Sequence, residues 1–165
     1  MEKEKRTACR WIDENRVTYE ETARYIWSHP ELSLVEHKSS EKLQEVLRSG
    51  GFQIERGQSG MPTAFVATWG SGKPCIGFLA EYDALPNLSQ KAALTRQSPV
   101  VPGGAGHGCG HNLLGTSSCA AAVAVKTAME KHRSRGTGKV FGTPAEETLV
   151  GKIFMARDGV FDGTD

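Results

Sequence analysis

The stretch PCIGFLAEYDALP, residues 74–86, carries the clearest indication of the fold. Its first seven residues are almost continuously apolar, which is typical of a strand whose two faces are both covered. Two acidic residues, Glu81 and Asp83, follow this strand directly. They open a segment, residues 81–111, that has neither helical nor strand periodicity. A loop of this length in a compact domain is usually functional or disordered.

The residues before this stretch predict two helices and two further strands. Apolar residues at helical spacing predict a helix over 11–27, which Pro30 ends. A second helix is expected to begin at Ser39 or Ser40, either of which has a hydroxyl suited to an N-cap, and to end at Gly50 and Gly51. Strands are expected at 52–55 and 63–69, in addition to 74–80, and the short GSGK connection predicts a hairpin between the last two.

The residues after the long loop return to regular structure. Residues 112–131 are alanine-rich and predict a helix packed closely on a sheet, with Asn112 as its N-cap. A short strand is expected at 138–143, followed by a turn or helix over 144–159. This order of elements predicts a layered α/β domain. Sites in such domains lie in the loops that leave the carboxyl ends of strands, which here are 81–111 and 143–147.

Composition restricts the class of protein. The chain has 165 residues, of which 38% are hydrophobic and 24% charged, as is ordinary for one folded soluble domain. A net charge of +1 gives no electrostatic reason to expect a nucleic acid or a membrane surface as partner. We find no signal peptide and no run of ~20 apolar residues, and the four cysteines are widely separated. We therefore expect a cytoplasmic protein with free thiols.

A candidate metal site lies in the sequence GAGHGCGHNLLG, residues 104–115. Cys109 and His111 supply a thiolate sulfur and an imidazole nitrogen, both good zinc ligands, and the glycines allow the backbone to turn both side chains toward one ion. A helix that begins just after Cys109 would favour its thiolate form through the helix dipole. The alternative is a glycine-rich turn with an incidental cysteine, and the spacing alone does not decide between the two.

Two further motifs carry carboxylates. Residues 144–147, PAEE, place Glu146 and Glu147 after a predicted strand. Beside a metal, one of two adjacent carboxylates could bind the ion while the other takes a proton from water. Asp83 could accept an N–H from a ligand histidine and fix its tautomer. Taken singly, the first motif is more typical of a solvated helix start, and the second of a capped turn.

The other histidines and the cysteine admit different interpretations. His107 shares the glycine loop, so both a ligand and a structural role stay open, whereas His29, His37 and His132 are expected to be exposed and uncoordinated. Cys109 could instead be a nucleophile with His111 as its base. No cysteine-hydrolase signature surrounds Cys109, which disfavours that alternative.

Four motifs together resemble one family. SHPELSLVEHKSSEKLQEVLRSGGF, FLAEYDALP, GHGCGHNLLG and GTPAEE occur in the order and approximate spacing of the M20 metallopeptidases and amidohydrolases. The closest resemblance is to the branch of aminobenzoyl-glutamate utilization protein B-like amidohydrolases. It extends from about residue 10 to residue 165. Four motifs in register are far more specific than any one of them.

The resemblance implies a three-layer α/β/α zinc-peptidase-like catalytic domain and an assignment of roles. Cys109, His111 and Glu147 correspond to metal ligands, Glu146 to the general base, and Asp83 to the aspartate that orients a ligand. The cofactor implied is a divalent metal, Zn²⁺ or Mn²⁺, with two ions per site in full-length members. The reaction implied is hydrolysis of an amide bond in a small molecule: an N-acyl amino acid, aminobenzoyl-glutamate or a dipeptide-like substrate. Full-length members are expected to be homodimers.

The chain departs from the family pattern at two positions and in length. Glu81 stands where many members have a ligand histidine, although the nearer branch has an acid there, and Asn112 stands where relatives often have Asp. Residues 1–165 correspond to the N-terminal part of one catalytic domain. From the resemblance we expect the smaller lid and dimerisation domain, the C-terminal part and further histidine ligands to lie outside these residues. We therefore expect an open sheet edge, and the alternative function is an inactive remnant that binds one metal or a full-length partner.

Overall fold

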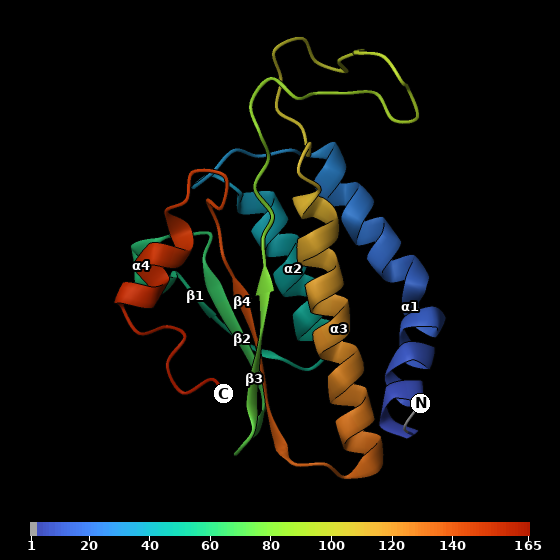
Figure 1. The fold of residues 1–165 in the computed structure, drawn as a ribbon, viewed down its shortest axis with the longest axis vertical. Coiled ribbons are helices and arrows are strands. Elements are labelled where there is room, and N and C mark those ends of the chain that lie inside the picture. Colours follow the sequence, from blue (N-terminus) through green and yellow to red (C-terminus); the bar gives the residue numbers. More distant parts are fainter. Residues whose placement is uncertain (1–2) are drawn as a thin grey trace.

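A computed structural model describes residues 3–165. The strands form one mixed sheet, and helices lie on both sides of it (Figure 1). In chain order they are α1 (Lys3–Ser28), α2 (His37–Ser49), β1 (Gln53–Arg56), a single 3₁₀ turn η1 (Gln58–Gly60), β2 (Phe65–Ser71), β3 (Cys75–Ala80), α3 (His111–His132), β4 (Gly136–Gly142) and α4 (Gly151–Arg157).

The sheet has the strand order β1-β2-β4-β3. β2 pairs antiparallel with β1 and with β4, while β3 pairs parallel with β4. The predicted hairpin between 63–69 and 74–80 is therefore wrong. The reason is that the chain returns from β3 through α3 in a parallel crossover, and β4 then bonds to both strands and separates them.

The core lies on both faces of the sheet, because neighbouring residues of a strand point to opposite sides. Phe65 of β2 and Val140 of β4 pack under the three long helices, whereas the next residues, Val66 and Phe141, pack with Met155 of α4. Figure 1 shows α1, α2 and α3 on one side of the sheet and α4 on the other. The predicted three-layer α/β/α arrangement is confirmed.

The helix starts differ from the prediction. α1 begins at Lys3 rather than at residue 11. Ser39 lies inside α2, and the carboxylate of Glu31 caps this helix from outside by accepting the backbone N–H groups of Lys38 and Ser39 at 3.0 and 2.9 Å. Ser40 is also not a cap, because its hydroxyl donates to the Thr63 carbonyl. A cap supplied by a residue several positions away cannot be found from local patterns.

The predicted cap of α3 is also wrong. Gly110, with a left-handed φ of 84°, is the N-cap residue, and Asn112 lies inside the helix. The Asn112 amide donates instead to the Ala23 carbonyl of α1 at 3.3 Å. The N-cap thus lies two residues before the predicted one, and His111 becomes the first residue of the helix.

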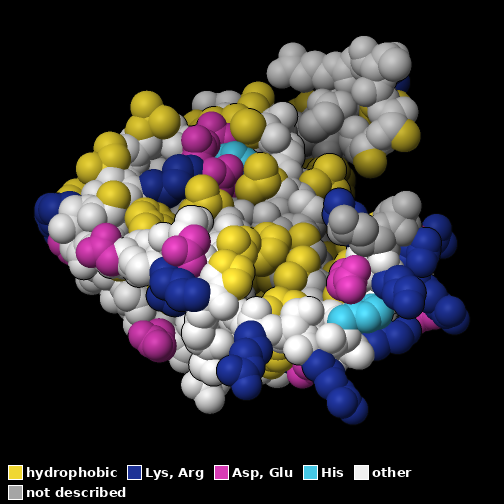
Figure 2. Space-filling model, turned by 60° about the horizontal axis from the view of Figure 1, so that its bottom comes forward, with side chains coloured by type: hydrophobic (Ala, Val, Ile, Leu, Met, Phe, Trp, Pro, Cys, Tyr) yellow, Lys and Arg dark blue, Asp and Glu magenta, His cyan; other side chains and the backbone are white. Residues whose placement is uncertain are grey.

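The strand β3 is less covered than its sequence suggests. Ile76 and Leu79 are 45% and 44% exposed, so the expected burial on both faces is wrong. Among the described strands, β3 has a partner on its β4 side alone, as expected for an open sheet edge. Figure 2 shows hydrophobic side chains gathered in the middle of the face that it presents, bordered by lysine and arginine side chains.

No helix within residues 3–165 is long and apolar enough to cross a membrane.

The packing of α3 against the end of β3 is close at Gly115 and can be tested there. A Cβ atom on Gly115 would lie well inside van der Waals contact with the Glu81 carbonyl oxygen. We expect Gly115→Val to lower the free energy of unfolding by about 1–3 kcal/mol, because the helix must move away from the strand end. Urea denaturation followed by circular dichroism measures this change.

The matched control is Ser117→Val on the exposed side of the same helix. It should cost no more than about 0.7 kcal/mol, the range of helix propensity for such residues. Equal losses from the two substitutions would contradict the close packing of α3 against β3.

Candidate metal centre

The residues singled out from the sequence meet at one end of the sheet. Glu81 and Asp83 follow β3, the PAEE segment follows β4, and His111 begins α3. Because β3 and β4 are parallel, their carboxyl ends lie at the same edge, which is the upper end of the sheet in Figure 1. Two loops far apart in the chain are thereby brought to the start of one helix.

His111 lies at the centre of this group and is 3% exposed. Its Nδ1 atom is 2.9 Å from Asp83 Oδ1 and 3.1 Å from the Asp83 carbonyl oxygen. Its Nε2 atom is 3.3 Å from Glu81 Oε2 and 3.5 Å from Glu146 Oε2. The hydrogen bond with Asp83 raises the pKa of His111 more than burial lowers it.

Asp83 is held as a charged acceptor although it is 1% exposed. Burial raises the pKa of its carboxyl group, but hydrogen bonds from His111, from the Glu147 backbone and from Ser33 lower that pKa by more. Its Oδ2 atom accepts the Glu147 N–H and the Ser33 hydroxyl, both at 2.9 Å. An ionised Asp83 accepts the Nδ1–H of His111, which leaves Nε2 with a lone pair on the side of Glu81 and Glu146, whereas Glu147 Oε1 lies 3.8 Å from Nδ1.

Two sets of three side chains could hold a metal ion. Cys109, His111 and Glu147 form one set; Glu81, His111 and Glu146 form the other. Within each set the ligand atoms lie within 4.8 Å of one another. Glu147 Oε1 is buried without a hydrogen-bond partner, which is costly for a carboxylate unless a cation is present. The first set, with one sulfur, one nitrogen and one oxygen donor, therefore fits a zinc-like ion.

The expected effect of the helix dipole on Cys109 is outweighed by its neighbours. Nearby carboxylates, first of all Glu147, raise the pKa of the Cys109 thiol, and burial of the group raises it further. The predicted preference for the thiolate is therefore wrong in the absence of a metal ion. Acidic residues at this helix start oppose the dipole because they lie close to the sulfur atom.

Lys152 is a residue of this site that the sequence analysis missed. Its ammonium group on α4 forms an ion pair with Glu81 and lies 4.0 Å from Glu146. Glu81, its partner, departs from the family pattern and is not among the site residues that the sequence predicts. In the sequence, the one indication for Lys152 is its position a few residues after PAEE. This position indicates a site residue only when the structure shows that α4 brings Lys152 to Glu81.

The remaining histidines lie outside both candidate ligand sets. Both ring nitrogens of His107 are buried without a hydrogen-bond partner, and burial lowers the pKa of this residue. His37 is exposed as expected, whereas His29 and His132 are half-buried and hydrogen-bonded to the Tyr25 carbonyl and to Thr7. The sequence leaves both a ligand role and a structural role open for His107, and the structure does not bring this residue into a ligand set.

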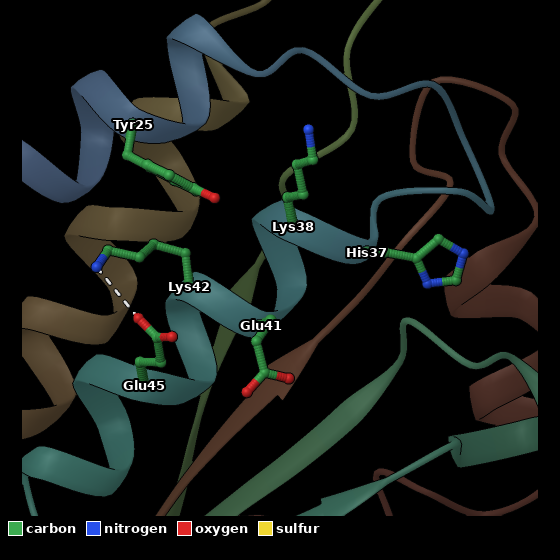
Figure 3. A pocket seen from close by; sticks show the side chains of 6 residues that line it. All are labelled: Tyr25, His37, Lys38, Glu41, Lys42 and Glu45. Atoms are coloured by element: carbon green, nitrogen blue, oxygen red, sulfur yellow. Dashed lines mark hydrogen bonds and ion pairs between the residues drawn. The ribbon is translucent and has the colours of Figure 1, made fainter.

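A separate pocket of about 450 Å³ lies between α1 and α2 (Figure 3). It contains none of the residues singled out from the sequence as site residues. Both of its carboxylates are already paired: Glu45 with Lys42 at 3.1 Å, and Glu41 with Arg48 at 3.0 Å. The carboxylate cluster around His111 is therefore the better candidate for chemistry.

Comparisons with known proteins agree with the motif resemblance. A model of peptidase family M20/M25/M40 matches residues 77–164. The chain is 48% identical over 154 residues to a p-aminobenzoyl-glutamate hydrolase component of Escherichia coli (strain K12), and this match covers 93% of this chain and 32% of that protein. It is also 34% identical over 174 residues to the Xaa-Arg dipeptidase of Mus musculus, covering 98% and 36%. This chain thus spans about a third of the length of the curated relatives it matches.

Solved structures show the same fold. The crystal structure of a candidate aminohydrolase from methicillin-resistant Staphylococcus aureus superimposes with a TM-score of 0.78 at 28% identity, covering 97% of this chain and 40% of that one. A dinuclear metal-binding peptidase of the M20 family from Bacillus subtilis superimposes with a TM-score of 0.69 at 24% identity, covering 98% and 42%. The second likeness concerns the fold alone.

The electrostatics of Cys109 lead to a test on the metal-free chain. Glu147→Gln removes the largest cause of the raised thiol pKa, so a larger fraction of Cys109 becomes thiolate at pH 8. We expect alkylation of Cys109 by iodoacetamide to become severalfold faster, as measured by peptide mass spectrometry in the presence of a chelator. Glu130→Gln, an exposed acid on α3, should leave the rate unchanged. A rate that does not respond to Glu147→Gln would show that this carboxylate does not control the thiol.

Proposed function

The chain belongs to peptidase family M20/M25/M40, and we propose that it carries a metal centre for the hydrolysis of amide bonds in small molecules. The observation that carries this proposal is the buried Glu147 oxygen without a hydrogen-bond partner, which lies in one cluster with Cys109 and His111. Such an oxygen needs a cation nearby, and the other two donors are those that zinc prefers.

Cys109, His111 and Glu147 would hold the ion, which we propose to be Zn²⁺ or Mn²⁺. A bound divalent ion supplies Lewis-acid chemistry: it polarises a carbonyl group and acidifies water. His111 enters this role with its Nδ1–H donated to Asp83, so that the ring is fixed and Nε2 is free. Asp83 is in turn held by Ser33 and by the Glu147 backbone, which supports a role in orienting the ligand.

Glu146 is the proposed general base. Its side chain is 27% exposed, in contrast to Glu147 at 17%, and its Oε2 atom is 3.5 Å from His111 Nε2. A carboxylate in this position can take a proton from water at the open side of the cluster and deliver it to the leaving amine. Two adjacent glutamates thus serve different tasks because one is turned toward Cys109 and the other toward the solvent-accessible side.

The substrate class proposed is an N-acyl amino acid, aminobenzoyl-glutamate or a dipeptide-like amide. The relative from Escherichia coli is part of a p-aminobenzoyl-glutamate hydrolase, which supports an aromatic acyl group joined to an amino acid. A second candidate function is binding of a single ion without turnover. Lys152 favours that alternative, because its ammonium group already neutralises part of the set formed by Glu81, His111 and Glu146.

Metal binding is the first testable consequence. After reconstitution with Zn²⁺ and gel filtration, we expect about one tightly bound ion per chain, measured by inductively coupled plasma mass spectrometry, since the first ligand set is the one with an unsatisfied donor. Cys109→Ser should lose the ion, whereas Cys75→Ser, at a buried cysteine on β3 remote from the cluster, should keep it in folded protein. Retention of the ion by Cys109→Ser would contradict the assigned ligand set.

Catalysis provides a separate test. We expect Glu146→Gln to keep the bound ion but to slow hydrolysis of p-aminobenzoyl-glutamate by roughly 10²–10⁴-fold, the usual contribution of a positioned acid–base group. Release of p-aminobenzoate, followed by chromatography, measures the rate, and Glu130→Gln is the matched control. A metal-loaded wild-type chain with no turnover would support the second candidate function. Unchanged turnover in Glu146→Gln would exclude this residue as the base.

A further inference from the structure

A second buried carboxylate lies beside the metal centre and has no role in the chemistry proposed above. Among residues 3–165, the acidic side chains that are buried are Asp83 and Glu36, and Glu36 is 0% exposed. Burial raises the pKa of Glu36, while hydrogen bonds to its carboxylate oppose that shift. Because burying a carboxylate is costly, its contacts should indicate what it holds in place.

The contacts of Glu36 join two loops that are far apart in the chain. Its Oε1 atom accepts the backbone N–H groups of Leu34 and Ala145, each at 2.8 Å. Its Oε2 atom accepts the Thr63 hydroxyl at 2.9 Å. Leu34 and Ala145 both have left-handed backbones, with φ of 69° and 58°, which residues with a side chain rarely adopt. One carboxylate oxygen thus holds two unfavourable backbone conformations at once.

One of these conformations immediately precedes the proposed base and ligand. Ala145 is fully buried, and Glu146 and Glu147 are the next two residues. The left-handed turn at Ala145 therefore sets the directions in which the two carboxylates leave the backbone. The same loop that contains Glu36 also contains Ser33, whose hydroxyl donates to Asp83 at 2.9 Å. The segment 32–36 thus contacts the centre at two independent points.

We propose that Glu36 is a positioning residue of the metal centre: by binding the Ala145 N–H it fixes the backbone turn that directs Glu147 toward the ligand cluster and Glu146 toward its open side. This inference rests on the proposed function. A role in folding alone would lower the stability of a Glu36 variant but would leave the metal geometry of the folded molecules unchanged. A positioning role changes the geometry itself.

Substitutions at Glu36 separate these roles, because the hydrogen bonds and the charge can be changed independently. Glu36→Gln keeps an oxygen for the Leu34 and Ala145 N–H groups, and its amide can donate to the Thr63 hydroxyl. Glu36→Ala removes all three bonds. Thr63→Val is the matched control, because it removes the contact to Oε2 and leaves the bond to Ala145 in place.

The probe is Co²⁺ titrated into the metal-free full chain and followed by visible absorption. The thiolate charge-transfer band reports Cys109, and the ligand-field bands report the geometry around the ion. We expect Glu36→Ala to weaken Co²⁺ binding by roughly 10–100-fold and to change the ligand-field bands, as for other residues that orient metal ligands. Glu36→Gln and Thr63→Val should keep the wild-type bands, and the conservative variant thus rescues the geometry.

Circular dichroism and urea denaturation establish that each variant is folded. If Glu36→Ala does not fold, Glu36→Asp, which keeps the charge but is too short to reach Ala145, should give the altered bands instead. A folded Glu36→Ala or Glu36→Asp chain with wild-type affinity and bands would overturn the inference while leaving the proposed function intact. A wild-type chain that binds no Co²⁺ would overturn the proposed function and this inference with it.

Discussion

The hydrogen bond between Asp83 and His111 is the contact on which the candidate site depends. It joins the residues that follow β3 to the first residue of α3, and Asp83 also accepts the backbone N–H of Glu147 after β4. One carboxylate therefore holds together three segments that the parallel β3–α3–β4 crossover brings to the same edge. The fold brings the three segments close together, and Asp83 orients the His111 ring and the Glu147 backbone.

The carboxylates of this cluster repel one another, and a cation between them lowers that repulsion. Glu81, Asp83, Glu146 and Glu147 all lie within 4 Å of the His111 ring nitrogens, and Lys152 is the cation that contacts them among residues 3–165. Lys152 pairs with Glu81 and lies near Glu146, whereas the Glu147 Oε1 atom in the other ligand set has no hydrogen-bond partner and no lysine or arginine beside it among residues 3–165. No positively charged side chain neutralises Glu147 on the Cys109 side among residues 3–165. A buried carboxylate is costly without such a charge, and this is the physical reason to expect a metal ion there.

Much of this arrangement could be predicted from the sequence, because strongly patterned elements and local motifs carry it. The helices, the four strands and the layered α/β class follow from hydrophobic runs and turn residues, whereas the roles of the five proposed site residues follow from the resemblance of their motifs to the M20 family. Pairing could not be predicted in the same way: the GSGK turn predicts a hairpin, and the crossover that places β4 between β2 and β3 is a property of the whole sheet. Contacts between distant loops were missed for the same reason. Three residues have roles that depend on partners outside their own segment: Glu31 caps α2, Glu36 binds the backbone of the PAEE turn, and Lys152 pairs with Glu81.

X-ray absorption at the zinc edge of the reconstituted chain measures the first coordination sphere directly. The account predicts one sulfur neighbour at about 2.3 Å, together with nitrogen and oxygen neighbours at about 2.0–2.2 Å. Loss of the sulfur contribution in Cys109→Ser would identify the donor. A first sphere of nitrogen and oxygen alone in the wild-type chain would contradict the account, because the ion would then not be held by Cys109, His111 and Glu147.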